Sequence, residues 1–175
     1  MGRTQLFGAQ PVEQRLSLKG ILLREANPGD IDTLLDLGAE LLASGHPTLV
    51  NGFDPEKSRH YLLWIMACAT AVNLVAEKDG DVIGALFGVL LPDMFSADVL
   101  GQEAFFGVFP QHRSFDLASE MIRTFTQTCF AVGATMVQFS PSTDEKWSRY
   151  RKLLARMGFE EVHVAMRCRK VLVSN

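Results

Sequence analysis

Long apolar runs are absent from the 175-residue sequence, and none approaches the ~20 residues that a membrane-spanning helix requires. The N-terminal residues also lack the basic stretch followed by an apolar stretch that is typical of a signal peptide. Cysteine is scarce: Cys68, Cys129 and Cys168 lie far apart in apolar surroundings, which favours buried thiols over a disulfide framework. These absences predict a cytoplasmic protein without a membrane span.

An excess of positive charge is missing as well. The 17 Lys and Arg residues are outnumbered by 20 Asp and Glu residues, and neither sign forms a long run, so nucleic acid is not an expected partner. The histidines and cysteines form no pair at ligand spacing, which predicts no metal site. Neither a Gly-Lys-Ser phosphate loop nor a Gly-x-Ser-x-Gly elbow occurs. The sequence therefore gives no support to the nucleotide-hydrolysing and serine-hydrolase classes that these motifs mark.

The length is that of one ordinary domain with a core of its own. Residues 1–19 mix polar with isolated apolar residues and show no period, so we interpret them as an N-terminal arm before a domain of residues 20–175. Packing against its own domain or against a partner would hold such an arm. It is therefore the expected contact in a homo-oligomer or a larger protein assembly.

The first half of the domain contains two helix starts. A short apolar strand from Ile21 precedes Asn27, Pro28 and Asp30, which have the pattern of a cap, a first-turn proline and a first-turn acid. Asp54 and its following proline begin a second helix. The buried face expected for that second helix consists of Tyr61, Trp64, Ile65 and Cys68.

Asp79 and Gly80 separate the apolar runs 72–76 and 82–91, which is typical of a tight hairpin between antiparallel strands. Strands and helices then alternate along the second half of the chain. We expect a loop at 92–101, a strand at 103–109, a helix at 116–132, a strand at 135–140, a helix at 145–157, and a closing strand or strands at 159–173.

Two local strings make this order of elements specific. Val108, Pro110 and Arg113 match a Val-x-Pro-x-x-Arg string at the end of a strand, and Met157-Gly158-Phe159 is similar to a helix-ending Leu-Gly-Phe. Over roughly residues 20–170 the sequence resembles the GNAT acyltransferase superfamily. The resemblance implies a single α/β (α+β) domain with a mixed, largely antiparallel central sheet flanked by helices.

The resemblance also implies a site for the pyrophosphate of acetyl-CoA, where amides at a helix start and the helix dipole favour an anion. The glycine of the usual motif is replaced by Asp116, which either caps the helix or weakens the cofactor site by its bulk and charge. Arg113 either contacts a phosphate or is a solvated surface residue. The predicted cofactor-binding residues are Val108, Arg113, Ser114, Phe115, Asp116, Leu117 and Ala118.

Catalysis in this superfamily requires a base for the amine and an acid for the departing thiolate. Leu154 occupies the position of the usual tyrosine acid, and Tyr150 lies one turn earlier on the same helical face. Glu103, on the strand before the cofactor loop, is the candidate base. The alternatives are Tyr150 as a packing residue and Glu103 as a solvated strand-end residue, while His46 and His112 are isolated loop histidines.

Two functions follow from the resemblance. The first is an acetyl-CoA-dependent N-acyltransferase that transfers an acetyl group to an unidentified amine on a small molecule or a protein. The second is a catalytically degenerate protein with the same fold, which serves as a binding or structural component of a larger assembly such as a tailed-phage virion. Loss of the glycine and the tyrosine favours the second function, and the intact Val-x-Pro-x-x-Arg string favours the first.

Overall fold

The computed structural model describes residues 15–17, 20–43, 52–140 and 148–162. The chain divides into a compact unit of residues 1–142 and a second unit of residues 143–175. In the described residues, the strands are β1 (Arg15–Ser17), β2 (Ile21–Glu25), β3 (Ala71–Lys78), β4 (Asp81–Pro92), β5 (Val99–Val108) and β6 (Met136–Gln138). The helices are α1 (Ile31–Ala43), α2 (Pro55–Ala67), α3 (Phe115–Ala131) and, in the second unit, α4 (Ser148–Arg156), with 3-10 turns at Pro28–Asp30 and Pro110–His112.

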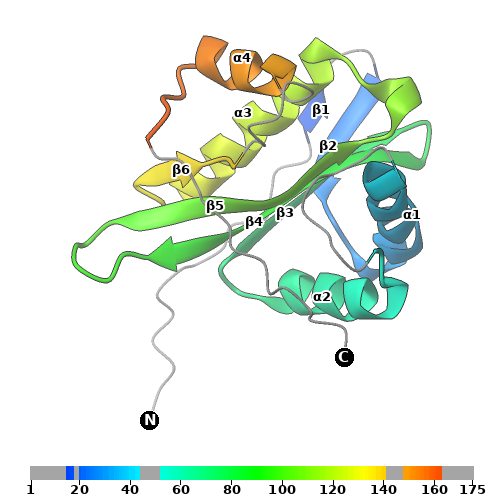
Figure 1. The fold of residues 1–175 in the computed structure, drawn as a ribbon, viewed down its shortest axis with the longest axis horizontal. Coiled ribbons are helices and arrows are strands. Elements are labelled where there is room, and N and C mark those ends of the chain that lie inside the picture. The colour runs from blue at the N-terminus through cyan, green and yellow to red at the C-terminus, as the bar shows by residue number, and fades with distance from the viewer. Residues whose placement is uncertain (1–14, 18–19, 44–51, 141–147, 163–175) are drawn as a thin grey trace, which may run out of the picture. The chain divides into compact units, whose positions relative to one another are not determined.

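The described strands form one sheet in the order β1-β2-β3-β4-β5-β6. Every neighbouring pair is antiparallel except β5 and β6, which are parallel. Helices α1 and α2 cover one face of this sheet and α3 covers the other (Figure 1). The predicted fold class is confirmed: a mixed, largely antiparallel sheet flanked by helices.

The N-terminal end of the sheet lies inside the segment that we interpreted as an arm. Residues 15–17 form β1, which pairs with β2 from Arg15 opposite Leu23 to Ser17 opposite Ile21. Residues 1–14 and 18–19 lie outside the described residues. The described part of the arm therefore extends the sheet by one edge strand.

The predicted hairpin is confirmed at Asp79 and Gly80. Both residues have positive φ, 54° and 91°, as a two-residue hairpin turn of the favoured twist requires. Lys78 pairs with Asp81 directly across the turn. A glycine at the second position adopts this conformation without the clash of a Cβ atom.

Both predicted helix starts are confirmed, but the buried face of α2 is only partly as expected. Asn27 and Asp30 form a reciprocal capping box, and Asp54 caps α2 through the amide of Lys57. In α2, Ile65 is fully buried, whereas Tyr61 and Trp64 are 46% and 57% exposed. The core instead receives Leu62 and Met66, so the inward face is rotated away from the two aromatic rings.

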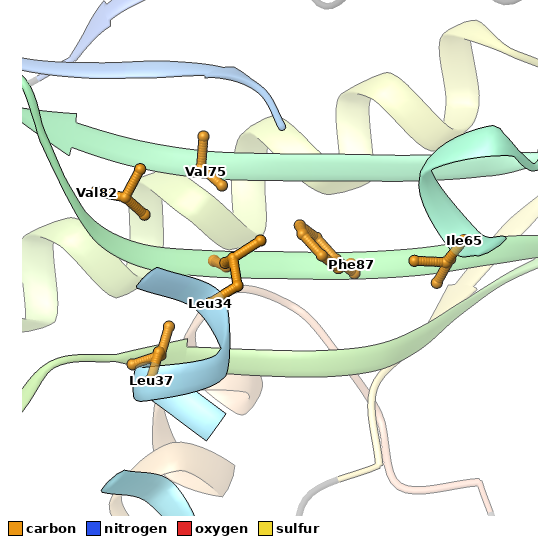
Figure 2. Packing of buried hydrophobic residues seen from close by; sticks show 7 residues of the cluster. Leu34, Leu37, Ile65, Val75, Val82 and Phe87 are labelled. Carbon is orange, nitrogen blue, oxygen red and sulfur yellow. The ribbon is translucent and has the colours of Figure 1, made fainter. Parts of the chain in front are cut away.

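A hydrophobic core between α1, α2 and the sheet holds the first helical layer in place (Figure 2). Leu34 and Leu37 of α1 and Ile65 of α2 face Val75 of β3 and Phe87 of β4, and all five are buried. Full burial of each such side chain stabilises the fold by about 1.5–3 kcal/mol. This packing anchors α1 and α2 on β3 and β4, the strands that precede β5 in the sheet.

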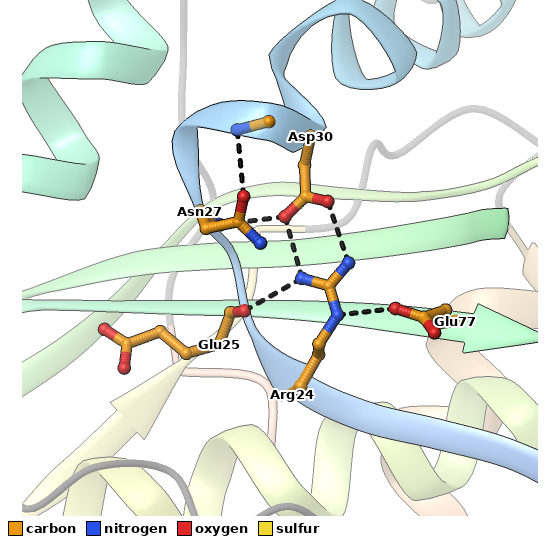
Figure 3. A network of polar contacts seen from close by, with 6 residues as sticks. Arg24, Glu25, Asn27, Asp30 and Glu77 are labelled. Atoms are coloured by element: carbon orange, nitrogen blue, oxygen red, sulfur yellow. Dashed lines mark hydrogen bonds and ion pairs between the residues drawn. The ribbon is translucent and has the colours of Figure 1, made fainter. Parts of the chain in front are cut away.

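Arg24 on β2 forms a polar cluster that the sequence did not indicate (Figure 3). Its guanidinium binds both carboxylate oxygens of Asp30 at 2.8 Å, and its Nε donates to Glu77 on β3 at 2.6 Å. Burial raises the pKa of Asp30, but the hydrogen bonds from Arg24 and from the Asn27 amide outweigh it, so the pKa is lowered overall. The cluster ties β2, β3 and the start of α1 together.

Strand β5 begins four residues earlier than predicted, at Val99, and the loop before it is correspondingly short. Val99 pairs with Pro92 of β4, and the next residue pairs with Met136 of β6. Pairing on both sides thus extends the strand through residues that looked like loop. The predicted helices near 116–132 and 145–157 are confirmed as α3 and α4, while residues 141–147 and 163–175 lie outside the described residues.

Candidate active site

The pairing of β5 with its neighbours changes partway along the strand. Along its whole length β5 pairs with β4, but β6 pairs with it only from Leu100 to Gln102. In the described part of the chain, no strand lies in register with residues 103–108 on the β6 side. We call residues 103–108 the open edge of β5. It leads directly into the turn before α3.

Glu103 is the first residue of the open edge. Its carboxylate Oε2 accepts a hydrogen bond from the backbone N–H of Ser140, just beyond β6, at 3.3 Å. Burial raises the pKa of this carboxyl, and the Ser140 amide only partly offsets the effect. A carboxylate with a raised pKa is a better proton acceptor near neutral pH, as a general base requires.

A bulge lies beside Glu103. Phe105 pairs with Phe87 and Glu103 pairs with Gly88, so Ala104 has no partner residue on β4. Gly88 is required here, because a Cβ atom would come within 2.5 Å of the Gln102 carbonyl oxygen and of the Phe125 ring. The bulge bends the strand at the point where the open edge begins.

The open edge ends at the turn before α3, about 17 Å from Glu103 at the usual rise of a strand. Ser114 is the N-cap of α3, and its Oγ accepts from the amide of Leu117 at 3.1 Å. The Ala118 amide donates to the Ser114 carbonyl oxygen. Among the predicted cofactor residues, Leu117 and Ala118 therefore use their amides inside the helix start, and the Leu117 side chain is buried.

Arg113 fastens this turn to the end of β5. Its Nε donates to the carbonyl oxygen of Val108 at 2.9 Å, while the Val108 side chain is buried. The residue itself is exposed, and no described carboxylate forms an ion pair with it. The guanidinium of this exposed residue is thus held at the turn.

Asp116 is not the cap of α3, because Ser114 takes that position. It lies in the first turn and is exposed, and in the described structure its carboxylate accepts no hydrogen bond from the first-turn amides. Its charge lies near the positive end of the helix dipole, which favours the helix by about 0.3–1 kcal/mol. The backbone N–H of Asp116 has no carbonyl partner within the helix, as for every first-turn amide. Phe115 is also in this turn and half exposed.

The remaining candidates lie apart in the sequence. Tyr150 is in α4, within the unit of residues 143–175, and Leu154 one turn later is buried. His112 is in the 3-10 turn before α3, and His46 lies outside the described residues. Cys129 is buried, which raises the pKa of its thiol to about 12 and makes it unreactive at neutral pH.

Two residues of the site were not found from the sequence: Gln102 and Ser140. They lie 38 positions apart, and Gln102 Nε2 donates to Ser140 Oγ at 3.2 Å. Neither belongs to a motif, and the contact exists only because β6 ends beside the middle of β5. A map of paired strands would have been needed to find it.

The described residues contain no group of three or more His, Cys, Asp or Glu side chains that could hold a metal ion. Nor is any described helix both long and apolar enough to cross a bilayer. The polar groups at the site are a carboxylate, a guanidinium and the amides of a helix start. Such groups suit proton transfer and anion binding.

Comparison with protein families identifies the chain. The model of the Acetyltransferase (GNAT) family matches residues 39–159, which include α2, the hairpin, β5, the turn and α4. The chain belongs to this family. The matched GNAT segment contains every predicted site residue, from Glu103 to Tyr150. A search of curated protein sequences found no match.

Solved structures agree on the GNAT fold. A putative acetyltransferase from Agrobacterium tumefaciens has a TM-score of 0.68 and 17% identity, over 85% of this chain and 99% of that one. Glucosamine-6-phosphate N-acetyltransferase from Arabidopsis thaliana has a TM-score of 0.65 and 16% identity, over 85% and 97%. A predicted acetyltransferase from Clostridium acetobutylicum, solved with acetyl-CoA, has a TM-score of 0.70 and 14% identity, over 85% and 96%. At these identities the likeness extends to the fold.

Proposed function

We propose that this GNAT-family protein is an acetyl-CoA-dependent N-acetyltransferase that acts on an amine of a small molecule or a protein. The supporting observation is the open edge of β5, which runs from a partly buried carboxylate at Glu103 to the N-terminus of α3. Both groups that the reaction needs, a base and an anion site, thus lie at the two ends of one strand segment. One protein with a similar fold, the predicted acetyltransferase from Clostridium acetobutylicum, was solved with acetyl-CoA.

The residues of this chain fit acetyl-CoA at the α3 end. The amides of Ser114 and Asp116 and the guanidinium of Arg113 would hold the diphosphate, because first-turn amides and a cation stabilise a negative charge. In this proposal Asp116 weakens the site without blocking it, because the residue is exposed and Ser114 takes the capping position. When bound, acetyl-CoA supplies the acetyl group as an activated thioester.

At the other end, Glu103 accepts the proton that the attacking amine must lose. Its raised pKa strengthens it as an acceptor. In this proposal Tyr150 donates the proton that the leaving thiolate requires, since Leu154 at the usual position has no proton to give. Changing Tyr150 to Phe tests that assignment and should lower kcat without changing the affinity for acetyl-CoA.

The test is a thiol-release assay with acetyl-CoA and a panel of primary amines: polyamines, aminoglycosides, amino sugars and lysine peptides. We expect free CoA to appear only with a suitable amine, and desulfo-CoA to inhibit it competitively. Calorimetry on the same sample measures binding separately. Binding of acetyl-CoA without turnover of any amine would contradict catalysis and favour the degenerate binding protein. The absence of both would contradict the proposed cofactor site as well.

A further inference from the structure

The parallel pairing of β5 and β6 stops abruptly at Gln102, opposite Gln138. If the register continued, Glu103 would lie opposite Phe139, and Ser140 opposite Ala104. Side-chain contacts replace that ladder. Ser140 gives its backbone N–H to the Glu103 carboxylate, and its Oγ accepts from Gln102.

Gln102 makes two contacts with one side-chain amide. Its Nε2 donates to the carbonyl oxygen of Glu103 at 2.9 Å and to Ser140 Oγ at 3.2 Å. The first bond satisfies a backbone acceptor at the place where the ladder ends, as backbone groups require when they leave water. The second ties the end of β6 to the same point. One side chain thus connects both strands where they separate.

We propose that Gln102 is a positioning residue for Glu103: its amide ends the β5–β6 ladder and holds Ser140 where the Ser140 N–H donates to the Glu103 carboxylate. This inference rests on the proposed role of Glu103 as the base. Gln102 touches neither substrate in this account and acts only through Ser140 and the Glu103 backbone.

The position of Ser140 matters because, among the described residues, its amide is the group that favours the charged form of Glu103. Burial raises the pKa of Glu103 and the Ser140 amide lowers it, and no charged side chain of the described residues contributes. Loss of the Gln102 tether lets Ser140 move away. The carboxylate then loses its donor, and its pKa rises further above its ordinary value.

The experiment measures the Glu103 carboxyl directly by carbon-13 NMR titration, with Glu103→Gln to assign the signal. The variants are Gln102→Leu, which removes the donor, and Ser140→Ala, which removes its acceptor at an exposed position. Ser140→Thr is the matched control, since it keeps a hydroxyl. We expect the first two variants to raise the pKa of Glu103 by about one pH unit, and Ser140→Thr to leave it near that of the wild type.

Amine-dependent activity is measured on the same samples over a range of pH. The acid limb of the rate profile should move upward with the pKa in Gln102→Leu and Ser140→Ala and stay in place in Ser140→Thr. An unchanged Glu103 pKa in Ser140→Ala would overturn the positioning role, even in an active enzyme. A shifted pKa without activity in any variant would uphold the positioning role and contradict the proposed function instead.

Discussion

The two sides of β5 differ in how they are held. Its β4 side is paired from Val99 to Val108 except at the Ala104 bulge, and the core between the sheet and α1 and α2 packs against β4. Among the described strands, its β6 side is paired only from Leu100 to Gln102, before the open edge begins. The closed side supplies rigidity, and the open side leaves a strand edge beside a carboxylate and a helix start. Substitutions on the two sides should therefore separate stability from activity.

Glu103→Gln should have the largest effect of all on activity. Removing a general base lowers kcat by about 10²–10⁴-fold. Stability should change in the opposite direction: a raised carboxyl pKa imposes a cost that develops as pH rises above the ordinary range of Glu, and the variant avoids it. Thermal melts at pH 5 and pH 8 with parallel rates check both. A less stable variant at pH 8 would contradict the account.

Arg24→Met should lower the stability of the sheet on the β4 side of β5 without changing any residue of the candidate site. It leaves Asp30 buried and unpaired, which costs about 3–5 kcal/mol of stability. The double variant Arg24→Met with Asp30→Leu should recover much of that loss in urea unfolding. In the wild type, the stability contributed by Asp30 should be present at neutral pH and lost as pH falls below about 3.8. Equal destabilisation by single and double variants would show that the ion pair does not matter.

Gly88→Ala tests the packing at the bulge of β5, where the paired part of the strand gives way to the open edge. The new Cβ would lie 2.5 Å from the Gln102 carbonyl oxygen, which is backbone and cannot move independently. We expect a loss of about 1–3 kcal/mol in unfolding free energy. Gly84→Ala, whose nearest contact would be 3.0 Å, is the graded control and should lose less. The reverse order would mean that the bulge at Ala104 adapts freely.

Asp116→Gly should have the smallest effect of the four, and it should act on acetyl-CoA binding at the open edge. Removing a negative charge beside the diphosphate should tighten acetyl-CoA binding roughly tenfold, or about 1.4 kcal/mol. The helix loses a favourable first-turn acid and gains a glycine, so stability should fall by about 1 kcal/mol. Calorimetry and melting give the two numbers. Weaker binding in the glycine variant would show that Asp116 supports the site.

The sequence was informative wherever local chemistry decides the structure. Asn27 and Asp54 specify helix caps through their side chains, and Asp79-Gly80 between apolar runs specifies a turn through its backbone conformation. The face of α2 was predicted wrongly at Tyr61 and Trp64, because only packing against the sheet selects which side of a weakly amphipathic helix turns inward.

The site was less accessible to sequence reasoning. Its motif residues follow one another along the chain, so the turn and the α3 start could be predicted, although Ser114 rather than Asp116 is the cap. The raised pKa of Glu103 depends on burial and on Ser140, a residue 37 positions away. Contacts of that kind arise from strand pairing, which residue patterns alone do not specify.

Hydrogen exchange with and without acetyl-CoA tests the comparison most directly. If acetyl-CoA lies along the open edge, amides of residues 103–108 and of the first turn of α3 should exchange more slowly in its presence. Amides of the β3–β4 hairpin should be unchanged. Protection confined to the hairpin, or none along residues 103–116 at saturating acetyl-CoA, would contradict the assignment of the open side as the active site.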